Sequence, residues 1–160
     1  MIPRSTTLDT NVLPIDDLRS LAARFCIDLA ITTVTDTEIG ADDPRARDLL
    51  RLSEPLVLGE SPLGVGVMAP EERGQRFDRI LAIISNESFP RRGYRSNLTD
   101  GQRRQLRDAI AFEAHIASGR DAFVTKDEKA FVNEGRRAKL QTLGQTQVLT
   151  RAEFMTLLSS

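Results

Sequence analysis

Short runs of β-favouring residues alternate with longer runs that have helical spacing along this chain. Residues 25–35, FCIDLAITTVT, are dense in β-branched side chains, which pack well on a pleated sheet, and they predict a strand. Similar short runs bring the expected strands to four, at residues 5–8, 25–35, 121–125 and 147–150. The stretch at 54–70 is apolar but interrupted by proline and glycine, so it fits a strand, a hairpin or a packed loop.

Helix signals fall between these strands. Apolar residues recur with helical spacing in the segment PEERGQRFDRILAIISN and predict a helix over 70–86. A threonine followed three residues later by Glu or Gln is a capping box, which marks helix starts at Thr35–Glu38, Thr99–Gln102, Thr125–Glu128 and Thr150–Glu153. The expected helices therefore cover residues 14–24, 35–51 with a break at Pro44, 70–86, 99–118, 125–143, and the end of the chain from 150.

This alternation predicts the fold class. Each connection between strands is long enough to cross over and return the next strand in parallel. We therefore expect one α/β domain over residues 1–160, a three-layer α/β/α sandwich with a mostly parallel central sheet. A chain of this length buries about 70% of the surface that its unfolded form exposes, which is enough for one core.

Composition narrows the class further. The chain is 40% hydrophobic and 28% charged, an ordinary globular balance. Its single cysteine, Cys26, has no partner for an internal disulfide, and we expect it to be a small buried apolar group. The sequence has neither the apolar stretch of a signal peptide nor a window that approaches a membrane span, so a cytoplasmic protein with no membrane partner is expected.

Four acids lie at or near the ends of the predicted strands, or on the helices beside them. In open parallel sheets, sites form beyond the carboxyl ends of the strands, where side chains from separate strands converge. Magnesium prefers oxygen ligands and is commonly shared between protein carboxylates and substrate phosphate, and a pair of such ions activates water for phosphodiester cleavage. The sequence therefore predicts a metal site made by Asp9, Glu38, Asp108 and Asp127.

The segments around these acids resemble the motif blocks of the PIN-domain nuclease family, VapC-like toxin ribonucleases among them. The matching segments are LDTNVL at 8–13, VTDTEI at 34–39, DAIAFEAHIASGRDAFVTKDEKAF at 108–131 and QVLTRAEFMTLL at 147–158. Residues 54–98 match the family poorly and are interpreted as an insertion that includes a basic loop.

This resemblance implies a PIN-like α/β/α sandwich that hydrolyses RNA with Mg²⁺ or Mn²⁺. It gives the four acids the role of catalytic metal ligands, and it gives Asn11 and Thr125 a supporting role in holding the site by hydrogen bonds. Many small members of the family are toxins of toxin–antitoxin pairs. The partners to consider are therefore RNA, an antitoxin protein and a second copy of the chain in a homodimer.

Between residues 91 and 107 there are six arginines and one acid, Asp100, in a chain of net charge −1. Arginine donates two hydrogen bonds to a phosphate at once, and Tyr94 in the same segment can stack on an unpaired base. The segment is either a path for RNA or a solvated charged face. The candidate RNA-binding residues are Arg91, Arg92, Arg95, Arg103, Arg104 and Arg107.

Several residues have a simpler interpretation beside the functional one. Glu38 also fits the end of a capping box, and Asp36 is the rival for its place as a metal ligand. We expect Glu128 to cap a helix, Asp121 to shape a turn, and His115, the only histidine, to have a partly buried packing role rather than to approach substrate phosphate. The alternative function is a PIN-like RNA- or protein-binding domain with an incomplete metal site; a receiver-like domain phosphorylated on Asp9 is less consistent with the lone DTN motif.

Overall fold

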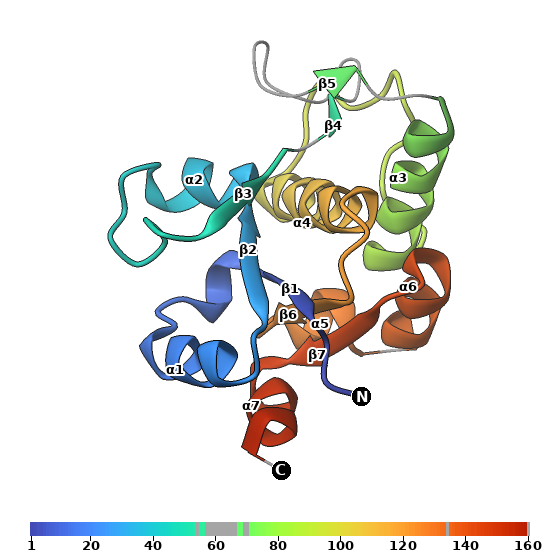
Figure 1. The fold of residues 1–160 in the computed structure, drawn as a ribbon. Helices are drawn as coiled ribbons and strands as arrows, with labels where there is room; N and C mark the ends of the chain where they lie inside the picture. The colour runs from blue at the N-terminus through green and yellow to red at the C-terminus, as the bar shows by residue number, and fades with distance from the viewer. Residues whose placement is uncertain (54, 57–66, 69–70, 134, 160) are drawn as a thin grey trace.

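A parallel sheet forms the centre of the computed structural model, which describes the chain except residues 54, 57–66, 69–70, 134 and 160 (Figure 1). In the described part of the chain, five strands pair in the order β3-β2-β1-β6-β7, and every pairing between them is parallel. The strands are β1 (Ser5–Leu8), β2 (Asp28–Thr32), β3 (Leu50–Leu52), β6 (Ala122–Thr125) and β7 (Gln147–Thr150). Two further short strands, β4 (Pro55–Leu56) and β5 (Val67–Met68), pair in parallel with each other.

Helices cover both faces of this sheet. The helical elements are the 3-10 helix η1 (Thr10–Val12), α1 (Asp16–Arg24), α2 (Thr33–Ile39), α3 (Glu71–Ile84), α4 (Asp100–Ala117), α5 (Glu128–Phe131), α6 (Arg136–Gly144) and α7 (Arg151–Ser159). Buried residues of α3, α4, α5 and α6 share one hydrophobic core, and those of α1 and α7 share the other. The expected three-layer α/β/α sandwich is confirmed, and its central sheet is parallel throughout.

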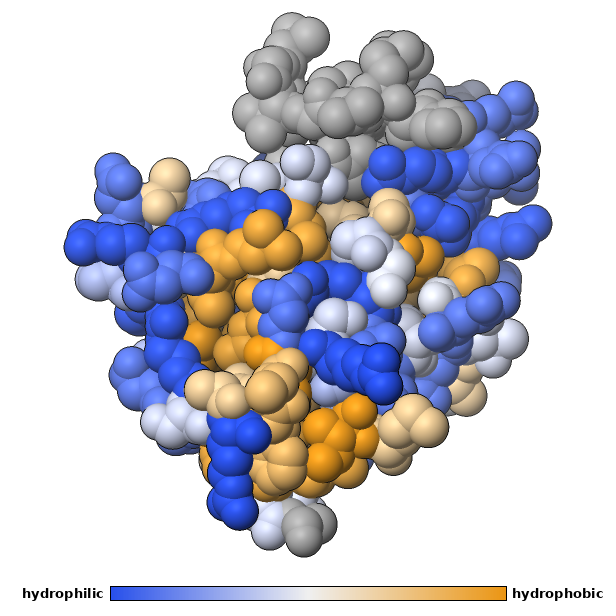
Figure 2. All heavy atoms as spheres, viewed as in Figure 1, coloured by the Kyte–Doolittle hydropathy of each residue, from blue (hydrophilic) through white to orange (hydrophobic). Residues whose placement is uncertain are grey.

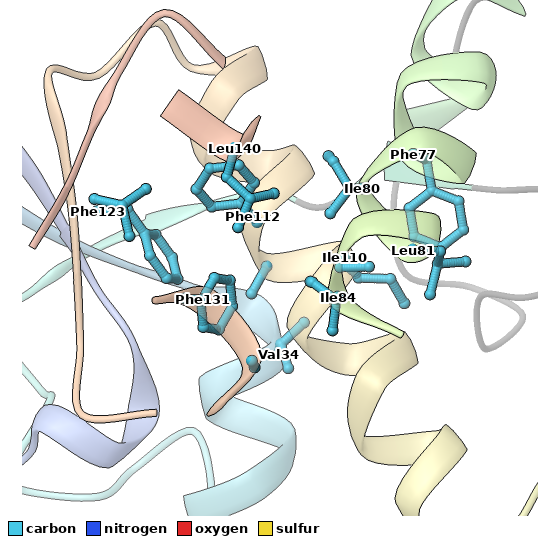
Figure 3. Packing of buried hydrophobic residues seen from close by; sticks show 14 residues of the cluster. Val34, Phe77, Ile80, Leu81, Ile84, Ile110, Phe112, Phe123, Phe131 and Leu140 are labelled. Atoms are coloured by element: carbon cyan, nitrogen blue, oxygen red, sulfur yellow. The ribbon is translucent and has the colours of Figure 1, made fainter. Parts of the chain in front are cut away.

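The two cores are built from alternate residues of the same strands. In β6, Phe123 points into the core with α4, whereas its neighbour Val124 points into the core with α1. Figure 3 shows the first core, where the Phe112 ring of α4 meets Phe123 edge-on with centroids 5.2 Å apart and Phe131 of α5 closes the aromatic group. Because β6 is buried on both faces, its sequence reads as a short apolar run.

A buried carboxylate links the two long helices of the first core. Glu113 of α4 has no exposed surface, and its oxygens accept hydrogen bonds from Arg76 at 2.6 and 2.7 Å and from Arg73 at 3.2 Å. Both arginines belong to α3, whose outer side is covered by hydrophilic residues in Figure 2. The ion pairs therefore hold α3 against α4 in a fixed register.

Two of the four predicted capping boxes are present. At the start of α4, the Gln102 amide donates to the Thr99 hydroxyl at 3.2 Å, and the Gln102 side chain accepts from the Thr99 amide at 2.9 Å. The same reciprocal pair joins Thr150 and Glu153 before α7. These two helix starts are predictable from the sequence because a capping box depends on residues within one turn.

The helix expected over 35–51 is wrong. α2 instead covers Thr33–Ile39, and its N-cap Thr32 makes no side-chain capping bond. Gly40 follows as the C-cap, and its φ of +91° favours glycine. The chain then turns into β3, an edge strand that was expected to be helical. The Arg51 guanidinium fixes that turn by donating to the carbonyls of Ala46 at 2.7 Å and Leu49 at 2.8 Å.

The single helix expected over 125–143 is also wrong. Asp127, rather than Thr125, caps α5, and its Oδ1 accepts from the Ala130 amide at 2.9 Å. The helix ends after one turn, and α6 begins after Gly135, which has a φ of +75°. Glu128 is thus the first residue of α5 and not the distal member of a capping box.

Cys26 departs from its expected burial. It follows the end of α1 with a φ of +54°, and its side chain is exposed. The left-handed backbone reverses the chain between α1 and β2 and turns the thiol outward. Among the described residues, no helix combines the length and the apolar character needed to cross a membrane.

Candidate functional site

The pairing of β1 with β6 brings Asp9, a predicted metal ligand, beside Thr125, a predicted supporting residue. Leu8 lies opposite Val124 in the parallel register, so the next residues, Asp9 and Thr125, leave the sheet side by side. The Asp9 amide extends the pairing by donating to the Val124 carbonyl at 2.9 Å. β1 is flanked by β2 on one side and by β6 on the other, and ligand sites form at such a point in open parallel sheets.

Hydrogen bonds hold the Asp9 carboxylate in one orientation. Its Oδ2 accepts from the Thr125 hydroxyl at 2.7 Å and from the Asn11 side-chain amide at 2.7 Å. Its Oδ1 accepts from the Thr10 amide at 2.8 Å, which makes Asp9 the N-cap of η1. The remaining lone pairs of a carboxylate held in this way are available to a ligand.

Asn11 and Thr125 also tie the neighbouring loop to the sheet. The Asn11 side-chain oxygen accepts from the Lys126 amide at 2.8 Å, and Thr125 Oγ1 accepts from the Asp127 amide at 2.9 Å. The loop that carries Asp127 is thereby fixed relative to Asp9. Both residues occupy the positions that the predicted supporting role requires.

Asp108 and Asp9 show how strongly the acids interact. Burial, followed by the charges of Asp9, Asp127 and Glu38, raises the pKa of Asp108 to about 8, and Arg104 opposes the rise. Burial also raises the pKa of Asp9 to about 6, with further increases from Glu38 and Asp127, while the Thr125 hydrogen bond lowers it. Carboxylates from four separate elements, η1, α2, α4 and α5, therefore act on one another at this edge of the sheet.

Glu38 and Asp36 occupy different surroundings on α2. Asp36 is paired with Arg51, whose Nη2 lies 3.2 Å from its Oδ1. Glu38 instead acts on Asp9 and Asp108, and its Oε1 lies 3.4 Å from Arg107 Nε of α4. Of the two rivals, the structure brings Glu38 to the other acids.

The acids do not yet form a closed set of metal ligands. In the part of the chain that the structure describes, no three His, Cys, Asp or Glu side chains are placed closely enough to hold a metal ion together. The type of donor nevertheless suits a hard cation, because all four side chains offer carboxylate oxygens and their mutual repulsion favours a bound positive charge. A shared ion would require the other carboxylates to move towards Asp9, which is held by its hydrogen bonds.

Two secondary expectations can be compared with the structure. His115 is fully buried between the Thr7 and Thr146 hydroxyls, each 2.8 Å away, and burial lowers its pKa to about 3, so its packing role is confirmed. Asp121 lies in a bend directly before β6, as expected of a turn residue, and its Oδ2 also accepts from the amides of Arg4 and Ser5, which ties it to the start of β1.

The six arginines divide into three groups. Arg92 and Arg95 pair with Asp78 of α3 and hold the loop before α4, with Arg91 beside them on a cavity of about 470 Å³ that none of the four acids lines. Arg103 pairs with Asp100 at the exposed start of α4. Arg104 and Arg107, which lie about one turn apart on α4, are the two that act on the predicted metal-binding acids.

Sequence reasoning missed one polar contact that links the site elements. The Thr10 hydroxyl of η1 donates to the Thr35 hydroxyl of α2 at 3.1 Å, and Thr35 is buried. Both threonines lie inside the quoted motif segments, so their position was visible. Their contact depends on how α2 packs beside η1, which no local pattern contains.

Comparisons of the chain with protein-family models, with curated proteins and with solved structures found no match. The function is therefore argued from the geometry and chemistry of the site.

The raised pKa of Asp108 predicts a pH dependence of stability in EDTA. Between pH 6.5 and 8 the folded protein retains a proton that the unfolded chain has released, so stability should fall as the pH rises. Asp108→Asn removes this titration, and its melting temperature should fall less across the window, by about 2–4 °C. Thermal unfolding at several pH values measures this. Asp100→Asn, at a fully exposed side chain, should behave like the wild type; identical slopes in all three proteins would refute the shared acid site.

Proposed function

We propose that this chain is a metal-dependent endoribonuclease of the PIN-domain kind, which hydrolyses RNA phosphodiester bonds at Asp9, Glu38, Asp108 and Asp127. The observation that carries the proposal is the orientation of Asp9 by Thr125 and Asn11 at the carboxyl end of β1, with three further carboxylates acting on it or on each other. The resemblance of these motif segments to PIN-domain nucleases supplies the substrate class.

The residues of the chain divide the work of such a site. Asp9 is the fixed ligand, because its carboxylate is already oriented, and Asp108 and Glu38 approach it from α4 and α2. Asp127 shares its carboxylate with the α5 cap, so it is suited to bind through water. Bound Mg²⁺ or Mn²⁺ would supply charge for the phosphate and a water of lowered pKa. Asp108 must release its proton before it serves as a ligand, so metal affinity should increase with pH.

One observation favours the alternative function, a PIN-like RNA- or protein-binding domain with an incomplete metal site. The described acids are not arranged as a ready metal-binding group, and Glu38 is paired with Arg107. In that case Arg104 and Arg107 would bind phosphate without hydrolysis. The antitoxin and homodimer partners that the resemblance implies belong to the nuclease proposal. Co-purification with the product of the neighbouring gene tests the antitoxin, and the molar mass of the purified protein in solution tests the homodimer.

Asp9→Asn should abolish RNA cleavage while the protein remains folded. The amide has the same shape as the carboxylate but loses the negative charge, and the loss of a metal ligand should reduce the rate by at least ~10³-fold. Cleavage of labelled single-stranded RNA in Mg²⁺ or Mn²⁺ measures the effect. Asp36→Asn is the matched control, because Asp36 pairs with Arg51 and should be dispensable. Wild-type activity in folded Asp9→Asn would refute the proposed site.

Arg104→Gln should weaken RNA binding and lower its dependence on salt. If the Arg104 guanidinium neutralises one phosphate, the log–log slope of affinity against salt should become shallower by about 0.7 for single-stranded RNA. Fluorescence anisotropy across a salt series, in the Asp9→Asn background, measures it. Arg103→Gln removes the same charge from a side chain paired with Asp100, and should leave the slope unchanged. Equal slopes for wild type and Arg104→Gln would assign Arg104 to the solvated surface.

A further inference from the structure

Arg107 contacts the acid that the nuclease proposal assigns as the second metal ligand. Its Nε lies 3.4 Å from Oε1 of Glu38, and the two side chains are 46% and 28% exposed, so both remain accessible to a ligand. Arg107 comes from α4 and Glu38 from α2, helices that lie beside each other in Figure 1. Because Glu38 in turn acts on Asp9 and Asp108, this guanidinium lies at the edge of the acid cluster.

The charges around Glu38 make Arg107 the counterion of that side of the site. Glu38 raises the pKa of both Asp9 and Asp108, which shows that its charge faces other carboxylates. Arg104, one turn earlier on α4, acts on Asp108 instead, and Arg103 is paired with Asp100. The two arginines near the acids thus serve different carboxylates.

We propose that Arg107 competes with a divalent cation for Glu38, and that a phosphate group of the substrate relieves this competition by binding Arg107. The inference rests on the proposed nuclease function and makes Arg107 a positioning residue for that site. Glu38 cannot give the same carboxylate lone pairs to a guanidinium and to a metal at once. In the absence of substrate, Arg107 therefore holds Glu38 in a geometry that leaves the ligand set open.

Phosphate is a suitable competitor for this guanidinium. The fork of an arginine donates two parallel hydrogen bonds to phosphate oxygens, whereas Arg107 Nε lies 3.4 Å from Oε1 of Glu38, at the long end of hydrogen-bond distances. An exposed ion pair is also weak enough for a ligand to exchange. Because coupling between two ligands is reciprocal, phosphate should tighten metal binding through Arg107, and metal should tighten phosphate binding to the same extent.

Titration with Mn²⁺ alone tests the competition directly. Free Mn²⁺ is followed by electron paramagnetic resonance at pH 8, with no nucleic acid present, for wild type, Arg107→Gln and Arg104→Gln. We expect Arg107→Gln to bind Mn²⁺ about fivefold more tightly than wild type, which is the upper range for the loss of an exposed ion pair. Arg104→Gln loses the same charge near Asp108 but not the contact with Glu38, so it reports the general electrostatic gain and should change the affinity less.

A second titration uses saturating uridine 5′-monophosphate as the phosphate probe. The nucleotide should tighten Mn²⁺ binding more in wild type than in Arg107→Gln, because only the wild type has a competitor to remove. Arg107→Lys keeps the charge without the fork, and it should show weaker nucleotide coupling than wild type. Arg107→Lys also keeps the inference testable if Arg107→Gln does not remain folded.

The outcomes separate this inference from the function on which it rests. Mn²⁺ binding by wild type with equal affinity in Arg107→Gln, or with an equal gain in Arg104→Gln, would overturn the role of Arg107 and leave the metal site in place. The absence of millimolar Mn²⁺ binding in all of these proteins would overturn both. Tight binding confined to Arg107→Gln would support the inference strongly.

Discussion

The hydrogen bond from the Thr125 hydroxyl to the Asp9 carboxylate joins the carboxyl ends of the two central strands, and the site depends on it. At 2.7 Å it links a fully buried donor to a charged acceptor, which is the stronger class of hydrogen bond. The parallel register of β1 and β6 makes the contact available, and Asn11 extends it to the following loop. A hydrogen-bond network whose polar groups are all paired holds its side chains in one orientation.

The same fold also places carboxylates near one another, and their negative charges repel. Burial and neighbouring carboxylates raise the pKa of Asp9 to about 6 and that of Asp108 to about 8, so the fold makes their charged forms costly. The buried charge of Glu113 is paired instead: this carboxylate has no exposed surface and is held by Arg73 and Arg76. Around Asp9, Arg104 acts on Asp108 and Arg107 contacts Glu38 at 3.4 Å. That contrast is what a site for a cation or a phosphate-bound cation would show.

Much of the architecture was predictable because its signals are local. The β-branched runs located β1, β2, β6 and β7, and the capping box at Thr99 fixed the start of α4 to the residue. β3 was missed because three residues at a sheet edge carry no period of their own. Its place depends on Arg51, which holds the preceding turn and also occupies Asp36.

The site was predictable to the level of strand ends and motif segments, and no further. The convergence of Asp9 with Thr125 follows from parallel pairing, which the alternation of strands and helices implies. The choice between Asp36 and Glu38 depends on side chains of β3 and α4. Asp36 pairs with Arg51 of β3, whereas Glu38 lies beside Arg107 of α4. Such contacts arise from the packing of helices that are distant in sequence, so they lie beyond any local pattern.

We propose that the carboxylates of Asp9, Glu38, Asp108 and Asp127 together form one cation site. Crystals of the protein soaked in Mn²⁺ and measured at the manganese absorption edge test it most directly. The account predicts an anomalous peak about 2.1 Å from a carboxylate oxygen of Asp9, with Asp108 or Glu38 as a second ligand. Ordered crystals that keep the Asp9–Thr125 hydrogen bond but show no peak beside Asp9 would contradict it.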